Sequence, residues 1–355
     1  MIKNINLVLC ADQNYVNLLV PCLISILVNK NNDTHFNITI FESGINPTDQ
    51  EKIKGLISFD KANNSTITFM DIKKEFKNLF YYQTSYIDLN VHFSEAILYR
   101  LVIPKVFPNK EKVLYLDVDT IIQGDLFNFY NQSFEGNYLI SQKGTFLQKY
   151  LDAEIKYDNK IYSYKDIYTK ILGFNQGFFK GNNYIDSSVL IFNIPKIIAD
   201  KKDEQILQLM SQHSNSLIFA DQDILTKSFL YKVKDLKSLN KNKPSVYAIL
   251  ESNLFRSEEH KDKFLDEKIK NALILHYISK PTKLRKIAKH ANHKIYYKYL
   301  QMSYLALPNY QLFWINLITL WRKIRFYCFR IQKIKEVKKS RVIYLGLFNY
   351  RIKIK

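Results

Sequence analysis

The amino-acid sequence predicts an α/β protein with a mostly parallel sheet, helices on both faces of that sheet and a basic helical tail at the C-terminus. Strand-like and helix-like segments alternate through about the first 200 residues, the order typical of parallel sheets. The segment Lys112–Gln123, KVLYLDVDTIIQ, is apolar enough for a strand in the middle of a sheet. From Trp321 to Lys355 there are twelve Lys or Arg residues and one acid, which gives +11 of the net charge of +19.

Apolar spacing predicts the individual elements. Strands are expected at Ile5–Ala11, Phe36–Phe41, Thr66–Asp71, Lys112–Gln123, Tyr184–Ile194 and Ala272–His276. Helices are expected at Val16–Leu27, Asn46–Leu56, Ser94–Val102, Lys196–Gln212 and Asp221–Leu230. Pro47 marks the start of the second helix, Ser94 is a candidate cap for the third, and Pro195 stops the fifth strand. Residues 142–183 are polar and rich in tyrosine, and predict a mobile loop region with a short helix near Lys165–Leu172.

Composition bounds the class of protein. Hydrophobic residues make up 47% of the chain, enough for a globular core in one domain of residues 1–300, followed by a C-terminal region of residues 301–355. Cys10, Cys22 and Cys328 have no zinc or disulfide spacing, which fits a reducing cytoplasm. The apolar run ending at Cys10 is shorter than the ~7–15 residues of a secretory signal, and no stretch approaches the ~18–20 apolar residues of a spanning helix. We therefore expect a cytoplasmic protein.

Asp117 and Asp119 are the most informative residues. Carboxylates at i and i+2 of a strand point to the same side, and burying them is costly without a partner. In open α/β sheets the carboxyl ends of strands are where ligands bind, so a hard divalent cation is the obvious partner. A pair of surface acids, or an acid capping the next turn, is the alternative. No glycine-rich GxGxxG follows the first strand, so the dinucleotide fingerprint is absent.

Six segments together resemble glycosyltransferase family 8, retaining nucleotide-sugar transferases that include bacterial lipopolysaccharide galactosyl- and glucosyltransferases. In chain order they are CADQNY at Cys10–Tyr15, SEAILYRLVIP around Arg100, KVLYLDVDTIIQGDL, YIDSSVLIFNI, ADQDIL at Ala220–Leu225 and the pair His276-Tyr277. The resemblance covers roughly residues 5–283 and implies a nucleotide-binding, Rossmann-like fold of the GT-A type.

The resemblance also implies roles for residues. A UDP-sugar donor would be bound by Asp12, Asn14, Tyr15, Arg100, Asp117, Val118, Asp186 and either Lys280 or Lys283. A metal ion, Mn²⁺ with Mg²⁺ possible, would be held by Asp117, Asp119 and His276. Such mixed oxygen and imidazole ligands suit these ions. Asp221 and Gln222 are the implied catalytic residues, with Gln222 near the anomeric carbon.

Two departures from the family pattern bear on the donor site. Asp186 stands where the family has asparagine, so an acceptor-only carboxylate replaces an amide that can also donate. The segment HYISKPTKLRK lacks the family's glycine and tryptophan after the histidine. Spacing does not choose between Lys280 and Lys283 as the diphosphate ligand.

The resemblance implies hexosyl transfer with retained configuration onto a saccharide or glycolipid acceptor, such as lipopolysaccharide, lipooligosaccharide or another surface glycan. It suggests a front-side displacement in which the leaving phosphate takes the acceptor's proton. Two other functions stay open. DVDTI has the pattern of an aspartate-nucleophile phosphohydrolase, with Ile121 in the Thr/Val position, and the charge of +19 would also suit a non-catalytic basic binding protein.

Pro308–Lys338 interleaves aromatic residues with arginine and lysine. This pattern favours a helix that lies in an anionic membrane surface, placing the protein on the inner face of the cytoplasmic membrane. A nucleic-acid arm and a helix packed on the core are the alternatives, and no nucleic acid is expected as a partner.

Overall fold

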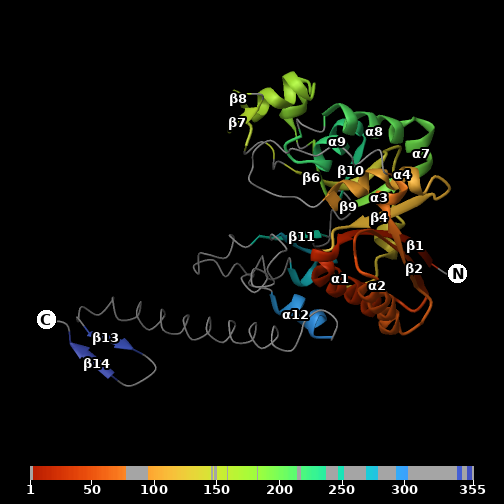
Figure 1. Cartoon of the computed structure of the whole chain (residues 1–355), viewed down its shortest axis with the longest axis vertical. Helices are drawn as coiled ribbons and strands as arrows, with labels where there is room; N and C mark the ends of the chain where they lie inside the picture. The colour runs from red at the N-terminus through yellow and green to blue at the C-terminus, as the bar shows by residue number, and fades with distance from the viewer. Residues whose placement is uncertain are drawn as a thin grey trace.

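The computed structural model describes residues 3–76, 95–144, 147, 150–157, 159–181, 183–213, 217–236, 247–251, 269–278, 293–302, 342–345 and 350–353. The described strands form one seven-stranded sheet, one three-stranded sheet and two separate two-stranded pairs. Helices lie on both faces of the larger sheet (Figure 1). The predicted α/β fold class is confirmed.

The large sheet has the order β10-β6-β9-β4-β1-β2-β3. Its strands are β1 (Lys3–Asp12), β2 (Thr34–Ser43), β3 (Thr66–Asp71), β4 (Lys112–Leu116), β6 (Leu139–Gly144), β9 (Tyr184–Asn193) and β10 (Val233–Asp235). Among these seven, β9 is antiparallel to both of its neighbours, and every other pairing is parallel. The amino-terminal end of β9 therefore lies at the edge where the parallel strands have their carboxyl ends.

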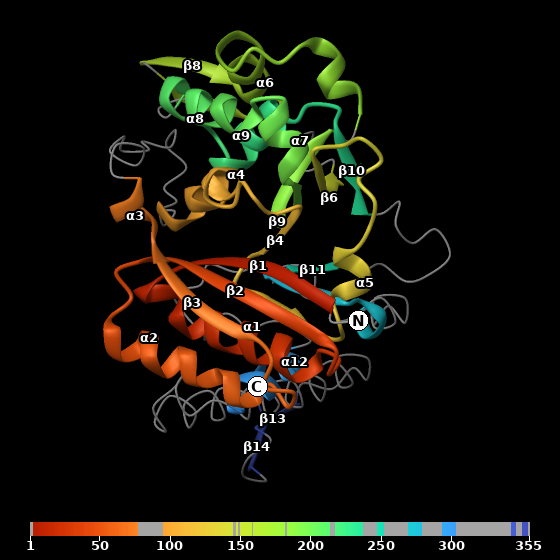
Figure 2. The ribbon, with the colours of Figure 1, turned by 90° about the vertical axis from the view of Figure 1, so that its right-hand side faces the viewer.

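Both faces of the sheet are buried, which explains its apolar runs. Along β1, Ile5, Leu7 and Leu9 pack with α1 (Val16–Asn29), while Val8 and Cys10 pack toward the opposite face. Figure 2 shows α1, α2 (Pro47–Lys54) and α12 (His293–Gln301) on one side of the sheet. The other side carries η3 (Glu95–Val102), α4 (Ile103–Val106), α7 (Ile194–Ala199), α8 (Lys202–His213) and α9 (Asp221–Ser228).

The strand predicted over Lys112–Gln123 is in fact two strands. After β4 the chain leaves the large sheet, and β5 (Thr120–Ile122) joins a second sheet of order β11-β12-β5. In that sheet β5 pairs with β12 (Ile274–Ile278), which pairs on its other side with β11 (Tyr247–Glu251). Asp117–Asp119 form the link between the two sheets and belong to neither strand. The prediction that strand alternation aligns the two carboxylates was therefore wrong. The turn after Leu116 aligns them instead.

Three predicted helices differ in detail. The helix expected at Lys196–Gln212 is split into α7 and α8, and Lys201 between them has φ 53°. Glu95–Val102 forms a 3₁₀ helix, and Ser94 lies outside the described residues. In α2, Asn46 caps the first turn, and a 3₁₀ helix, η2 (Gly55–Phe59), follows. Shorter elements are η1 (Gln13–Tyr15), α3 (Ile72–Glu75) and α5 (Phe127–Tyr130).

The segment predicted as a loop region contains regular structure. A hairpin of β7 (Glu154–Tyr157) and β8 (Lys160–Ser163) precedes α6 (Tyr164–Asp166) and a π-helical turn, η5 (Ile167–Ile171). A 3₁₀ helix, η6 (Gln176–Lys180), follows. The short helix predicted near Lys165–Leu172 is confirmed, and the hairpin was missed because its alternation is short and polar.

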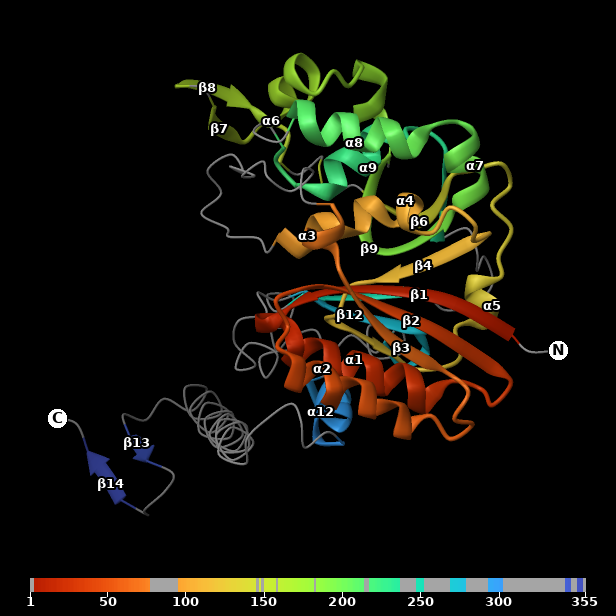
Figure 3. The same ribbon diagram turned by 45° about the vertical axis from the view of Figure 1, so that its right-hand side comes forward.

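At the C-terminal end, Figure 3 shows α12 beside α1, where Tyr299 Oη accepts a hydrogen bond from Asn29 Nδ2 at 2.8 Å. The helix predicted over Pro308–Lys338 lies outside the described residues. Beyond it, β13 (Val342–Leu345) and β14 (Tyr350–Lys353) form an antiparallel pair, so a helical tail is wrong for that stretch. Both strands are rich in β-branched and aromatic residues, which favour strands. No helix of the described residues is both long and apolar enough to cross a membrane.

A buried ion pair ties the end of α1 to the loop before β3. Lys30 Nζ lies 2.8 Å from Asp60 Oδ1, and the two side chains are 2% and 0% exposed. Asp60 Oδ2 also accepts hydrogen bonds from the backbone nitrogens of Asn64 and Ser65. The carboxylate therefore organises the whole loop.

We expect Asp60→Ala to lower the free energy of unfolding by about 3–5 kcal/mol, because it leaves Lys30 buried without a counter-charge. Asp33→Ala is the control, since it removes an exposed pair with Lys3 (34% and 52% exposed) that contributes less than about 1 kcal/mol. Urea denaturation of both variants measures the difference. Equal losses would contradict the importance of burial at this pair.

Candidate functional site

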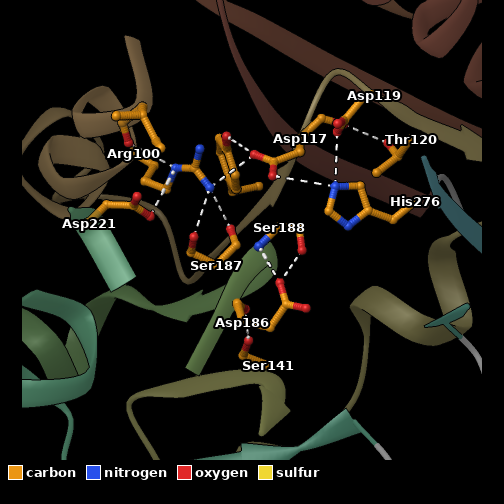
Figure 4. Close-up of polar contacts among 12 residues, drawn as sticks. Arg100, Asp117, Asp119, Thr120, Ser141, Asp186, Ser187, Ser188, Asp221 and His276 are labelled. Carbon is orange, nitrogen blue, oxygen red and sulfur yellow. Dashed lines mark hydrogen bonds and ion pairs between the residues drawn. The ribbon is translucent and has the colours of Figure 1, made fainter. Parts of the chain in front are cut away.

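The site lies at the edge of the large sheet where the parallel strands end (Figure 4). The link after β4 supplies Asp117 and Asp119, and β12 supplies His276. His276 Nε2 is 3.0 Å from Asp119 Oδ1 and 3.8 Å from Asp117 Oδ2. One ligand atom from each residue lies within 4.8 Å of the other two. Two carboxylates and one imidazole at this spacing fit a divalent cation.

The pairing of β5 with β12 and hydrogen bonds to the carbonyls of the link hold these three residues together. Thr120 on β5 is opposite His276 on β12. The nitrogen of Tyr277 donates to the carbonyl of Asp119 at 2.9 Å, and Thr120 Oγ1 donates to the carbonyl of Asp117 at 2.7 Å. Pairing of β5 with β12 thus places a histidine from late in the chain beside the two aspartates.

The neighbouring carboxylates favour the protonated form of His276. Burial alone lowers the pKa of His276, but the negative charges of Asp119 and Asp117 outweigh it and raise the pKa to about 9. Asp186 adds to this effect. The charge of the carboxylates therefore favours a cation at this point, either a proton on His276 or a metal ion among all three side chains.

Arg100 holds one oxygen of Asp117. Its Nη1 lies 2.9 Å from Asp117 Oδ1, and the Tyr115 hydroxyl donates to the same oxygen at 2.5 Å. The guanidinium also lies 4.3 Å from the centre of the Tyr115 ring. The other oxygen, Oδ2, is the one that lies toward His276. Arg100 and Tyr115 thereby fix the orientation of Asp117.

Arg100 also joins two other segments to the site. Its Nη1 donates to the carbonyl (2.7 Å) and hydroxyl (3.1 Å) of Ser187 on β9, and its Nε lies 3.4 Å from Asp221 Oδ2 at the start of α9. Its side chain is 6% exposed. The printed contacts of the guanidinium engage Nε and Nη1, so it is held from several sides.

The turn before α9 places Asp221 and Gln222 differently. Asp221 is fully buried behind Arg100; burial raises the pKa of its carboxyl to about 6, against the opposing effect of Arg100. Gln222 is half-buried, and its backbone nitrogen donates to the carbonyl of Phe219 at 3.1 Å. Asp221 therefore lies against the guanidinium, and Gln222 is the more accessible of the two.

The carboxylate of Asp223, the next residue, accepts four hydrogen bonds from the protein. Its Oδ1 accepts hydrogen bonds from the hydroxyls of Tyr168 (2.5 Å) and Tyr184 (2.7 Å). Its Oδ2 accepts from the backbone nitrogens of Ile218 (2.7 Å) and Phe219 (2.9 Å). The side chain is 1% exposed and fully hydrogen-bonded, as a buried carboxylate without a cation requires.

The three residues predicted to hold the nucleoside come together at the end of β1. Asp12 Oδ1 accepts from the nitrogen of Asn14 at 2.8 Å and so caps η1, while Asn14 itself is exposed. Burial raises the pKa of Tyr15 to about 12, with further contributions from Asp12, Asp119 and Asp117. The Tyr15 phenol is thus close to the acidic cluster.

Four predicted residues remain: Asp186, Val118, Lys280 and Lys283. Asp186 Oδ1 accepts hydrogen bonds from the backbone nitrogen and the hydroxyl of Ser188, which holds the carboxylate at the start of β9. The Val118 side chain is buried in the core, so only its backbone could contact a donor. Lys280 and Lys283 lie outside the described residues.

Sequence reasoning missed Tyr115, Ser187 as a partner of Arg100, and the network around Asp223. Tyr115 lies two residues before Asp117, but because β4 ends between them, strand alternation did not indicate the bond between the two side chains. No local pattern connects Asp223 with Tyr168, which is 55 residues away.

The family model described as "Glycosyl transferase family 8" matches residues 6–284. A Haemophilus influenzae protein provisionally named a glycosyltransferase is 26% identical over 233 residues, 65% of this chain and 61% of the relative. The chain thus spans less than two thirds of that relative.

Several solved structures share the fold. The bifunctional glycosyltransferase WbbM in its apo form has a TM-score of 0.65 and 17% identity, covering 84% of this chain and 50% of WbbM. The galactosyltransferase LgtC, solved with donor and acceptor sugar analogs, has a TM-score of 0.58 and 18% identity, covering 84% of this chain and 96% of LgtC. GlyE of Streptococcus pneumoniae TIGR4 has a TM-score of 0.53 and 18% identity, covering 85% and 61%.

We expect Mn²⁺ binding to release about one proton from His276 at neutral pH, because the imidazole must be neutral to coordinate a metal. Since the pKa of His276 is about 9, the affinity for Mn²⁺ should rise about tenfold per pH unit from pH 7 to 8.5. Calorimetric titration in two buffers of different ionisation enthalpy measures both quantities. His213→Asn should leave the proton release unchanged, and an affinity independent of pH over this range would contradict the assignment.

Proposed function

Because the chain belongs to glycosyl transferase family 8, we propose that it transfers a hexose from a UDP-sugar to a saccharide acceptor with retention of anomeric configuration. One observation carries the proposal: Asp117, Asp119 and His276 lie close enough together to hold a cation, at the edge of the sheet beside Arg100 and the Gln222 turn. A phosphohydrolase and a non-catalytic basic protein would leave the rest of this arrangement unexplained.

Asp117, Asp119 and His276 would hold Mn²⁺ or Mg²⁺. When bound, such an ion neutralises negative charge on the departing diphosphate. Arg100 and Tyr115 keep Asp117 Oδ1 engaged, which leaves Oδ2 for the ion. This division of the two oxygens supports a site prepared for the metal before the donor arrives.

The donor would lie along the same edge. Asp12, Asn14 and Tyr15 at the end of β1 would bind the nucleoside, and Lys280 or Lys283 would contact the diphosphate as a point charge. The Asp186 carboxylate accepts hydrogen bonds and donates none when ionised, so it would select sugar hydroxyls that donate. Its position at the start of β9, close enough to influence His276, supports this placement.

Retention would proceed on one face of the sugar, without a covalent enzyme intermediate. A double displacement needs an accessible carboxylate nucleophile. Asp221 is buried against Arg100, and Asp223 has all its lone pairs engaged, so neither acid beside Gln222 suits that role. In our proposal the Gln222 amide faces the anomeric carbon while the leaving phosphate takes the acceptor's proton. A structure of LgtC is described as an active-site mutant in which glutamine is replaced by glutamate, which shows an active-site glutamine in that protein.

We further propose a lipopolysaccharide, lipooligosaccharide or other surface glycan as the acceptor. The protein would act at the inner face of the cytoplasmic membrane, bound through its basic C-terminal region. The charge of +11 within Trp321–Lys355 supports attraction to anionic lipid.

The first test is Mn²⁺-dependent hydrolysis of a panel of UDP-sugars without acceptor. Wild-type protein should hydrolyse one UDP-hexose, with the initial product retaining its configuration by NMR. Asp119→Asn should abolish the reaction, because it removes a metal ligand. Asp71→Asn, at the end of β3 on the same edge, keeps its helix-capping ability and should leave the rate unchanged. Full activity in Asp119→Asn would contradict the assignment of Asp119 as a metal ligand.

The membrane proposal has its own test. Replacing Arg322, Lys323, Arg325 and Arg330 by Gln in the full chain should weaken binding to phosphatidylglycerol vesicles by about 4 kcal/mol, since each basic side chain near an anionic surface contributes ~1 kcal/mol. Vesicle sedimentation measures the change, and neutral vesicles are the control. A protein lacking residues 308–355 that still sediments with anionic vesicles would count against this role.

A further inference from the structure

We propose that Asp223 is a positioning residue that couples the segment between β6 and β9 to the turn carrying Gln222. The inference rests on the proposed function of that turn, but its structural part can be tested without turnover. It assigns roles to Asp223, Tyr168 and Tyr184, which the mechanism above leaves without one.

The hydrogen bonds of Asp223 link three parts of the chain. Tyr168 lies on η5 within the β6–β9 segment, Tyr184 is the first residue of β9, and Ile218 and Phe219 precede the turn. Four donors occupy the lone pairs of the carboxylate. Loss of a single donor therefore leaves one lone pair of the buried Asp223 carboxylate without its hydrogen bond.

The turn that this network holds is strained. Ala220 has φ 52° and ψ −119°, and the nitrogen of Gln222 donates to the carbonyl of Phe219. This is the geometry of a type II′ turn, whose first central position favours glycine. A side chain persists there only where the surroundings enforce the conformation. The bonds from Ile218 and Phe219 to Asp223 lie directly before Ala220, so they enforce it.

Ring contacts extend the network into the segment. Tyr168 packs edge-on against Tyr184 (6.3 Å between ring centres) and Phe174 (5.5 Å), and Tyr184 packs against Phe219 (6.1 Å). Figure 2 shows α6, which leads into η5, on the same side of the sheet as α9. A π-helical turn such as η5 is uncommon and often accompanies function. Movement of the segment, as when an acceptor binds, would therefore move Gln222.

The Asp223→Asn variant separates a positioning role from a chemical one. In Asp223→Asn the amide oxygen can still accept from Ile218 and Phe219, while its two N–H groups can donate to the two tyrosine hydroxyls, which accept as well as donate. A positioning residue tolerates this exchange, whereas a carboxylate that attacks the sugar does not.

The experiment compares full-length Tyr168→Phe, Tyr184→Phe, Asp223→Asn and Tyr164→Phe. Tyr164 is the matched control: it is buried and contacts the Phe219 ring (6.2 Å), but makes no bond to Asp223. We expect kcat to fall about 10- to 100-fold in Tyr168→Phe and Tyr184→Phe, because a misaimed group costs this much, with the donor KM nearly unchanged. Asp223→Asn should keep most activity, and Tyr164→Phe all of it. Equal activity in all three tyrosine variants, or a folded but inactive Asp223→Asn, would overturn the proposal.

Hydrogen exchange supplies a readout independent of catalysis. The amides of Ile218 and Phe219 should exchange faster in Tyr168→Phe and Tyr184→Phe than in Tyr164→Phe at equal global stability. If wild-type protein hydrolyses no donor, the proposed function fails while this comparison still decides the coupling. Unchanged exchange at both amides would refute the coupling, whatever the activity.

Discussion

The ion pair between Arg100 and Asp117 is the interaction on which the site depends. The guanidinium is almost fully buried, yet it contacts the link after β4, the start of β9 and the start of α9. Removing either partner of a buried pair leaves an uncompensated charge. A single cation thus fixes three segments that are far apart in the sequence, and the position of Asp117 relative to the Gln222 turn follows from it.

Negative charge exceeds positive charge around this pair. Among the residues that the structure describes, Asp117, Asp119, Asp186 and Asp221 gather near one permanent cation, Arg100, and one titratable one, His276. Burial raises the pKa of Asp221, and the acids raise the pKa of His276. Both shifts have the same origin, an unmet demand for positive charge in a region of low dielectric constant. A divalent cation held by Asp117, Asp119 and His276, as we propose, would meet that demand.

The sequence was sufficient for features encoded locally. The apolar run of β1 and the paired acids after β4 were readable because burial on both faces and strand ends leave periodic signals. The break at Asp117 was not readable, since it arises from the pairing of Thr120 with His276, 156 residues later. The partners of Arg100 and the four donors to Asp223 likewise come from distant segments. Local propensity carries no information about such contacts, and only the resemblance to a family pointed to some of them.

The one antiparallel strand of the large sheet has a further consequence. Gly144 at the end of β6 is paired with Tyr184 at the start of β9, so the intervening chain leaves and re-enters the sheet at the same point of the same edge. Because the ends of that stretch are adjacent, its length and sequence can vary without shifting any strand, as long as a donor equivalent to Tyr168 is kept for Asp223. Chains with the same sheet and the same charged centre can in this way diverge in the molecules they accept.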